Sequence, residues 1–321
     1  MSGISRRRFL AGSIAGCAAT TLCGTKRAFA AGSFTGYPEG MGVLVDLTRC
    51  IGCRSCEAAC NKEQNLPAPA KPFDDLSVFD ETFHGGTQKR RPDETAYTVV
   101  NRYQPEGGGK PVYRKVQCNH CAEPACLTSC FVNAYTKTQE GAVVYNDKVC
   151  VGCRTCMVAC PFNVPAFKYS SAFHAKIMKC IFCHETRLKQ GRPPACVEIC
   201  PQQALTFGKR KDMIKIAHQR IQNEPGRYVD HLYGEKELGG TGWMYLSAVP
   251  FEQVGFDVAV QNEPILNNVK DFLSTVPMVL AIWPALFTGF HLLATNKGGH
   301  GHDDDHAGGD AAAHGEEDDK S

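Results

Sequence analysis

The sequence predicts an α+β fold: a body of two similar halves built around cysteine-rich loops, followed by one helix that crosses a membrane. Three observations predict it. Sixteen of the eighteen cysteines fall into four closely spaced quartets. A short β-branched segment precedes a nearly identical cysteine loop twice, about a hundred residues apart. Near the end of the 321-residue chain, an apolar run without a formal charge is long enough to cross a bilayer core.

The cysteine quartets have the spacing of iron–sulfur ligands. The third quartet reproduces the bacterial run C-x2-C-x2-C-x3-C-P, in which three thiolates bind one cluster and the fourth binds its neighbour. The spacing therefore predicts clusters that come in pairs. The quartets are Cys50, Cys53, Cys56, Cys60; Cys118, Cys121, Cys126, Cys130; Cys150, Cys153, Cys156, Cys160; and Cys180, Cys183, Cys196, Cys200.

Two other uses of cysteine fit this spacing less well. Zinc sites join two CxxC or CxxH units across a dozen or more residues, whereas three of the quartets place four thiols within about a dozen residues. The gap between Cys183 and Cys196 is zinc-like, but the C-x3-C-P ending of that quartet matches the third. A disulfide scaffold is typical of small secreted domains that lack a core. Iron–sulfur ligation is therefore the preferred interpretation.

Residues 1–30 have the features of a twin-arginine signal peptide. Residues 5–10 (SRRRFL) match the pattern S-R-R-x-F-L, a mildly apolar stretch follows, and residues 28–30 (AFA) form an A-x-A cleavage site. Such a leader predicts export of a folded protein that already carries its clusters. A lipoprotein-like box ending at Cys17 is the alternative cleavage site, which would leave Cys17 lipidated and retain Cys23.

Internal repetition organises the body, which we assign to residues 31–208. Residues 42–45 and 142–145 each predict a strand that leads into a cysteine loop, the start of a small β-α-β-type unit. Gly52 and Gly152 hold the same place in the two loops. Glycine supplies the backbone freedom that is needed where loop amides approach a sulfide.

Two further segments surround this repeat. Residues 61–115, rich in Pro, Gly and charge, predict an insertion over the clusters that suits docking better than catalysis. Its GGGK string is no phosphate loop, because Pro111 stands where Ser or Thr must bind magnesium. Residues 209–275 predict a C-terminal extension, with a helix over 209–223. Within it, residues 231–237 (HLYGEKE) are expected at the surface, where they suit contact with a partner.

The last part of the chain predicts a membrane anchor and a tail. Residues 276–295 (VPMVLAIWPALFTGFHLLAT) have the length of a transmembrane helix, and membrane helices tolerate Pro277 and Pro284. A buried or amphipathic helix is the alternative. His291, near the far end, suits the lipid interface better than contact with a quinone or haem. Residues 296–321 are rich in Gly, Asp, Glu and His and predict a disordered tail, with loose metal binding as the alternative.

The motifs point to a family. They are the four-quartet order, CNHCAEPACLTSC, CPFNVP, HLYGEKELGGT, the twin-arginine leader and the tail helix. In these the sequence resembles the membrane-anchored iron–sulfur subunit of hydrogenase-2 type uptake hydrogenases. The cluster core is also similar to electron-transfer subunits of formate dehydrogenase, dimethyl sulfoxide reductase, polysulfide reductase and high-molecular-weight cytochrome complexes. The sequence departs from a ferredoxin at Asn61 and Phe131, which stand in place of proline.

The resemblance implies two pseudo-symmetric bacterial-ferredoxin-like lobes with insertions and four [4Fe-4S] clusters. All sixteen ligand cysteines are present, and the fourth cysteine of each quartet would serve another cluster. The implied sets are Cys50, Cys53, Cys56 and Cys200 for cluster 1; Cys118, Cys121, Cys126 and Cys160 for cluster 2; Cys130, Cys150, Cys153 and Cys156 for cluster 3; and Cys60, Cys180, Cys183 and Cys196 for cluster 4.

The function that the resemblance implies is an electron relay on the periplasmic side of the inner membrane. It would connect a periplasmic catalytic subunit, a nickel–iron hydrogenase in this family, to a multi-span quinone-reactive membrane subunit. The alternative is the same relay for a multihaem cytochrome or a molybdopterin oxidoreductase linked to menaquinone. No catalytic residues are expected in this chain. A net charge of +2 without a basic stripe argues against a nucleic-acid partner.

Overall fold

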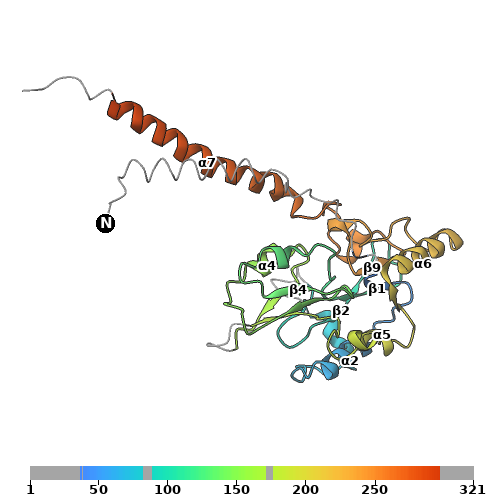
Figure 1. Cartoon of the computed structure of the whole chain (residues 1–321). Coiled ribbons are helices and arrows are strands. Elements are labelled where there is room, and N and C mark those ends of the chain that lie inside the picture. Colours follow the sequence, from blue (N-terminus) through green and yellow to red (C-terminus); the bar gives the residue numbers. More distant parts are fainter. Residues whose placement is uncertain (1–36, 38, 82–88, 171–175, 297–321) are drawn as a thin grey trace, which may run out of the picture. The chain divides into compact units, whose positions relative to one another are not determined.

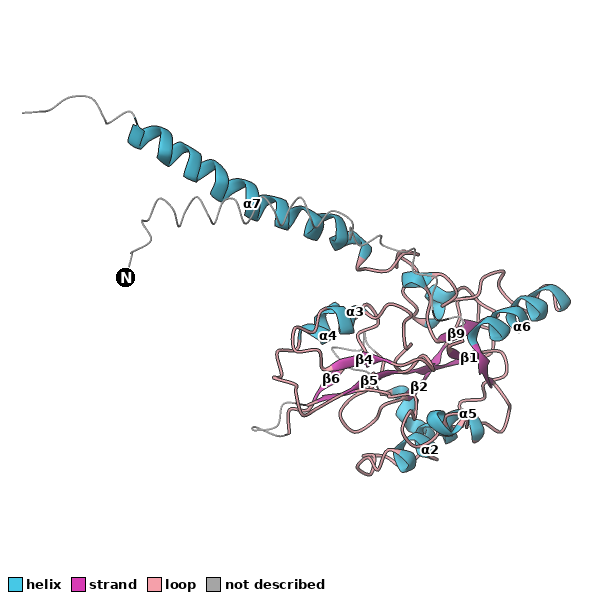
Figure 2. Ribbon diagram, viewed as in Figure 1, coloured by secondary structure: helices cyan, strands magenta, loops and turns pink. Residues whose placement is uncertain are grey.

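The computed structural model describes residues 37, 39–81, 89–170 and 176–296. The predicted leader at 1–30 lies outside the described residues, as does the predicted tail after Asn296. The chain divides into two units, Met1–Leu266 and Asn267–Ser321, which we describe separately. Within the first unit, helices and strands occur together, which confirms the predicted mixture of α and β structure (Figures 1 and 2).

A three-stranded sheet forms the centre of the first unit. β1 (Met41–Asp46) is its middle strand and pairs antiparallel with β8 (Leu205–Lys209) and parallel with β9 (Trp243–Leu246). Five of the six residues of β1 are buried, as expected for a strand covered on both faces. The predicted strand over 42–45 is therefore confirmed, and β9 shows that the C-terminal extension completes this sheet.

The two faces of β1 belong to two different cores. Val43 and Val45 pack with Trp243 in the larger core, whereas Leu44 faces the opposite side and packs with Met213. Met213 comes from α6 (Arg210–Asn223), which confirms the helix predicted over 209–223. The alternation follows from the period of two residues along a strand.

One arrangement of strands and helices occurs twice in this unit. In the first copy β1 pairs with β8, and the helices of the first and fourth quartets contact each other. In the second copy β4 pairs antiparallel with β5, and the helices of the second and third quartets contact each other. The elements are α2 (Ser55–Glu63) with α5 (Ala195–Glu198), α3 (Ala125–Thr128) with α4 (Thr155–Ala159), and β4 (Tyr135–Lys137) with β5 (Val143–Tyr145).

The segment 61–115 contributes almost all of a hairpin that the sequence did not predict. β2 (Val99–Tyr103) pairs antiparallel with β3 (Val112–Val116), and the GGGK string lies in the connection between them. The remaining elements are short: β6 (Ala166–Phe167) with β7 (Ile177–Met178), and the 3-10 helices η1 (Leu76–Asp80), η2 (Leu188–Gln190), η3 (Glu237–Gly239) and η4 (Phe251–Val254).

The expected exposure of residues 231–237 is wrong for most of this segment. Tyr233 is 1% exposed and packs against the rings of Phe251 and Phe256. Glu237 is also buried. Its carboxylate is satisfied there, because it accepts a hydrogen bond from the Gly234 backbone N–H (2.7 Å) and bonds to the His231 ring (2.6 Å). The charges therefore organise a turn that belongs to the core, while the proposed role in docking remains a prediction.

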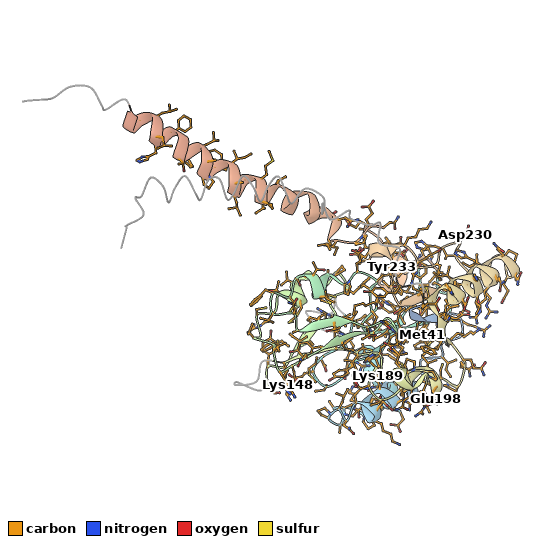
Figure 3. All side chains as sticks on the ribbon, in the orientation of Figure 1. Met41, Lys148, Lys189, Glu198, Asp230 and Tyr233 are labelled. Atoms are coloured by element: carbon orange, nitrogen blue, oxygen red, sulfur yellow. The ribbon has the colours of Figure 1, made fainter. Side chains whose placement is uncertain are left out.

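The second unit contains one long helix, α7 (Asn267–Asn296). Thr275–Ala294 is long and apolar enough to cross a membrane, by length and composition. Side chains project from this helix (Figure 3). Leu280, Trp283 and Phe287 are among its exposed residues. The helix predicted over 276–295 is therefore present, with Pro277 and Pro284 inside it. Asn296 ends this helix instead of beginning the tail.

Candidate iron–sulfur sites

The loops of the first and third quartets have the same backbone conformation. Gly52 and Arg54 have φ of 73° and 60°, and Gly152 and Arg154 have φ of 71° and 62°. A helix begins directly after each arginine. A Cβ atom at Gly52 would lie 2.4 Å from the ring of Tyr113. The first loop therefore requires glycine for its left-handed conformation and for the close approach of the hairpin.

The second and fourth quartets also share a local structure. Pro124 and Pro194 stand directly before the short helices α3 and α5, so neither helix can extend backwards. The carbonyl of each proline accepts the first hydrogen bond of its helix, 3.0 Å from the Leu127 nitrogen and 2.9 Å from the Val197 nitrogen. The third cysteine of each quartet thus lies in the first turn of its helix.

All sixteen cysteines of the body are described, and all are free thiols. Negative charge on neighbouring cysteines would raise the pKa of one thiol in each of four groups, and these groups cross between quartets, as the resemblance implies. Ligation of clusters by these groups remains a prediction. The interactions link Cys50 with Cys53 and Cys200; Cys60 with Cys180, Cys183 and Cys196; Cys121 with Cys118, Cys126 and Cys160; and Cys156 with Cys130, Cys150 and Cys153.

A cavity lies within the first of these groups. It is lined by four thiols together with apolar side chains, among them Val45 and Leu47. The four thiols belong to Cys50, Cys53, Cys56 and Cys200. A cluster requires four sulfur ligands around a space protected by apolar groups, so the residues present fit a [4Fe-4S] cluster.

The four groups follow one another through the body. Further interactions of the same kind connect cluster set 1 to set 4, set 4 to set 2, and set 2 to set 3. Two of the sixteen cysteines, Cys53 in set 1 and Cys153 in set 3, are exposed. The two outer sets therefore reach the surface. The connecting pairs are Cys56 with Cys196, Cys180 with Cys118, and Cys126 with Cys156.

Burial makes the charged thiolate form of these cysteines unfavourable unless a nearby cation compensates its negative charge. Burial raises the pKa of Cys60 well above its ordinary value, and the nearby thiolates of the same set raise it further. Burial likewise raises the pKa of Cys50 and Cys183 to about 11. Iron bound to these sulfurs would supply the positive charge that keeps them deprotonated. The donor sets are therefore suited to a metal cluster.

Backbone amides direct hydrogen-bond donors at several sulfurs. Such N–H···S contacts orient the ligand and stabilise negative charge on the sulfur. The contacts run from the nitrogen of Gly152 to Cys150 (3.4 Å), of Ala134 to Cys130 (3.3 Å) and of Phe182 to Cys180 (3.4 Å). This arrangement also fits cluster ligation.

Lys115 is a buried cation that the sequence analysis missed. Its ammonium donates hydrogen bonds to Thr98 (2.7 Å) and Gln117 (3.1 Å) and lies over the Trp243 ring. Burial alone would lower the pKa of Lys115, but the thiolates of cluster sets 1 and 4 outweigh burial and raise it. The lysine lies at the end of the segment predicted to be an insertion over the clusters, and lysines are seldom buried.

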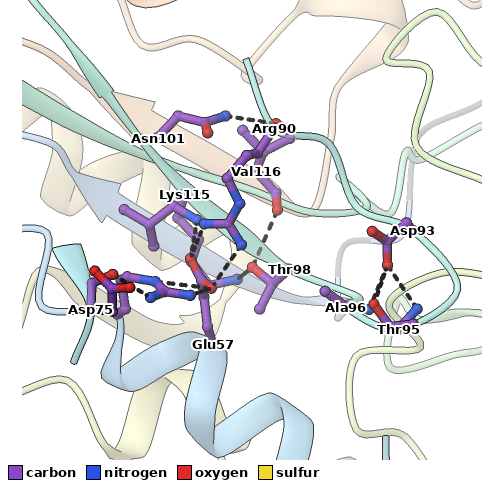
Figure 4. A network of polar contacts seen from close by, with 12 residues as sticks. Glu57, Asp75, Arg90, Asp93, Thr95, Ala96, Thr98, Asn101, Lys115 and Val116 are labelled. Atoms are coloured by element: carbon purple, nitrogen blue, oxygen red, sulfur yellow. Dashed lines mark hydrogen bonds and ion pairs between the residues drawn. The ribbon is translucent and has the colours of Figure 1, made fainter. Parts of the chain in front are cut away.

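A network of charges attaches this insertion to the first cluster loop (Figure 4). Glu57, on α2, pairs with Arg54 (3.0 Å) and with Arg90 (3.2 Å). It also accepts a hydrogen bond from the Val100 nitrogen of β2 (2.6 Å). From the same insertion, the carbonyls of Pro72 (2.9 Å) and Asp75 (3.0 Å) accept hydrogen bonds from the Arg54 guanidinium. These contacts hold the insertion and its hairpin against α2.

Family models match the same region. Residues 49–134 and residues 110–210 each match a 4Fe-4S dicluster domain. Together the two matches contain all sixteen cysteines, and each describes a domain with two clusters.

Known proteins are similar to the chain over most of its length. A protein of Nitratidesulfovibrio vulgaris is 52% identical over 296 residues, 92% of this chain and 78% of that protein. The hydrogenase-2 operon protein HybA of Escherichia coli O157:H7 is 34% identical over 276 residues, 78% of this chain and 83% of HybA. The iron–sulfur subunit of the nitrate-inducible formate dehydrogenase of Escherichia coli K12 is 32% identical over 218 residues, 65% of this chain and 69% of that subunit.

Proposed function

We propose that this chain, which belongs to the HybA-like family of iron–sulfur electron-transfer subunits, relays electrons through four [4Fe-4S] clusters. The relay joins a periplasmic catalytic subunit, a nickel–iron hydrogenase, to a quinone-reactive integral membrane subunit. Clusters of this kind supply one-electron transfer. The proposal includes two pseudo-symmetric lobes, export by the twin-arginine route and a C-terminal anchor in the inner membrane.

The observation that carries the proposal is the succession of four thiol groups with an exposed cysteine in each outer group. A relay needs redox sites that are close to one another inside the protein and reach the surface at two places. The connecting interactions between sets support the order 1, 4, 2, 3. The exposure of Cys53 and Cys153 supports electron entry and exit at sets 1 and 3.

The residues of the chain have three tasks in this function. The thiolates hold iron in the sets given above. Amide donors and Lys115 stabilise the negative charge of the ligand shell. The core around β1 and the Glu57 network keep the loops in place and exclude water.

Formate dehydrogenase iron–sulfur subunits are also similar to the chain, so a molybdopterin enzyme is the second candidate partner. A multihaem cytochrome is a further alternative. The electron relay itself is the same in each case. Hydrogen-dependent dye reduction by the complex purified from the native host separates the hydrogenase partner from both alternatives, which would give none.

The proposed anchor is tested by truncation after Asp271, which removes the apolar helix and retains every ligand. The exported body should remain coloured and become soluble. Hydrogen oxidation with an artificial dye should survive, whereas hydrogen-dependent quinone reduction should fall strongly. Truncation after Asn296 is the matched control, because it removes the tail and leaves α7 intact. Equal quinone reduction by all three proteins would show that the helix is not needed for the electron path.

A further inference from the structure

His120 connects the second quartet to the fourth. It stands between Cys118 and Cys121 in the ligand loop of set 2, in a left-handed conformation with φ of 48°. Its side chain is fully buried, and its Nε2 atom lies 3.5 Å from the Sγ atom of Cys180 in set 4. Cys118 and Cys180 also form the interaction that joins these two sets. His120 therefore lies where the two halves of the body meet.

The hydrogen bonds of the ring define which nitrogen carries the proton. The backbone nitrogen of Val143 lies 2.9 Å from Nδ1, and a backbone N–H can only donate. Nδ1 must therefore present its lone pair, which places the hydrogen of the neutral imidazole on Nε2. The Nε2–H group points at Cys180, so the contact is an N–H···S hydrogen bond.

The ring is held in this orientation from several sides. It stacks on Phe182 with 4.8 Å between centroids and 16° between planes, and Phe182 in turn packs against Trp243. The carbonyl of His120 accepts a hydrogen bond from the Lys137 ammonium at 2.9 Å. A side chain fixed in this way supplies a preorganised donor instead of an adaptable one.

We propose that His120 is the positioning residue of the junction between the lobes, and that its Nε2–H donor to Cys180 raises the reduction potential of cluster 4. The inference rests on the proposed cluster function. Cys180 also accepts the amide of Phe182, so its sulfur receives two donors. Both dipoles stabilise the additional negative charge of the reduced cluster, and burial strengthens this effect.

Two substitutions separate the donor from the rest of the side chain. In His120→Asn, the amide oxygen can replace Nδ1 as acceptor for Val143, but nothing reaches Cys180. In His120→Gln, the longer amide can present an N–H group to Cys180. His184 provides the matched control, since it follows Cys183 directly but its ring nitrogens contact Glu185 (2.9 Å) and Glu140 (3.2 Å).

The experiment is a potentiometric titration followed by electron paramagnetic resonance, on anaerobically purified full-length protein with its iron content measured. Centre 4 is identified as the signal that Cys180→Ser alters. H120N should lower the equilibrium constant for reduction of centre 4 about tenfold, or about 59 mV for one electron. H120Q and H184Q should leave it close to the native value. An unchanged centre 4 in an iron-replete H120N protein overturns the inference.

A second measurement uses the native protein and does not depend on the stability of a variant. With ¹⁵N-labelled histidine in the native protein, the signal of centre 4 should show a nitrogen hyperfine coupling. Absence of that coupling overturns the role of His120 and leaves the relay intact. A native protein without clusters would instead overturn the proposed function itself.

Discussion

The first and third cysteine loops have nearly the same sequence and backbone but different surroundings. Arg54 in the first loop is 1% exposed and pairs with Glu57, whereas Arg154 in the third loop is exposed and lies over the Phe167 ring at 4.6 Å. Met157 occupies the position of Glu57. The local motif therefore determines the loop, while the rest of the chain determines how the loop is covered.

The surfaces beside the two loops differ as a result. The insertion covers α2 through the Glu57 network. Val158, in the helix that follows Arg154, is 88% exposed, and Phe131, directly after the second quartet, is 71% exposed. We therefore expect the third loop, which is less covered than the first, to be the one that contacts a partner.

The test with the largest expected effect replaces the cysteines that are predicted to bind the cluster of another quartet. If the two lobes are equivalent, Cys160→Ser should alter the centre of Cys118, Cys121 and Cys126, and Cys60→Ser should alter the centre of the fourth quartet. Each change removes one of four thiolate ligands. Electron paramagnetic resonance on both variants shows which signal changes. If Cys160→Ser abolished the third-quartet signal alone, the pairing would be wrong.

The second test exchanges the residues that distinguish the two loops. Glu57→Met leaves Arg54 and Arg90 without their carboxylate and the Val100 N–H without an acceptor. Breaking a buried charge pair costs about 3–5 kcal/mol. The rate of anaerobic unfolding, followed by loss of the cluster absorption, should therefore rise by tenfold or more.

Met157→Glu is the matched reverse exchange. Met157 is only half-buried, and Arg154 nearby is exposed, so the new carboxylate remains hydrated and the unfolding rate should change much less. A similar acceleration in both variants would mean that burial of the first loop has no special importance.

The third test concerns the length of the helices that follow the two loops. Pro161 directly follows Cys160, and α4 ends at Ala159, whereas Asn61 allows α2 to continue to Glu63. Asn61→Pro should end α2 early and cost about 3 kcal/mol, because proline removes a helical hydrogen bond and clashes with the preceding turn. Pro161→Asn should cost less than about 1 kcal/mol. Helical content by circular dichroism and the unfolding rates measure both effects.

The sequence predicted the parts of the fold that depend on local pattern. The strands at 42–45 and 142–145, the helix over 209–223 and the apolar helix are all present, because each has a clear period or composition. The hairpin of β2 and β3 was missed. Its strands lie among many polar residues, and it is stabilised by contacts with Glu57 that are distant in the sequence.

The site was predictable to the same extent. The spacing of the cysteines indicated the ligands, but not the buried partners of the sulfurs. Lys115 and His120 are polar residues in polar segments, and their burial depends on packing against Trp243 and Phe182, which lie elsewhere in the chain. The inward orientation of Glu237 was missed for the same reason, since a charge run is most often hydrated.

The smallest expected difference between the two copies of the strand and helix arrangement is an ion pair between helices. Arg187 is 13% exposed and pairs with Glu63 of α2 (2.9 Å) and with Glu198 of α5, whereas neither α3 nor α4 contains a charged residue. A double-mutant cycle of Glu63→Gln and Arg187→Gln should give a coupling energy of about 0.2–1 kcal/mol that decreases with salt. Unfolding rates of the four proteins provide the measurement.

The pH dependence of this coupling has a definite sign. A hydrogen bond from Thr186, together with Arg187, lowers the pKa of Glu63. The stabilisation is therefore fully present above the ordinary carboxyl pKa and is lost only as pH falls through the lowered value. The coupling should be the same at about pH 6 and about pH 8, where the carboxylate is charged in both folded and unfolded chains. A coupling near zero, or one that salt does not reduce, would show that the Glu63–Arg187 ion pair does not stabilise the contact between α2 and α5. Packing alone would then hold both helix pairs together.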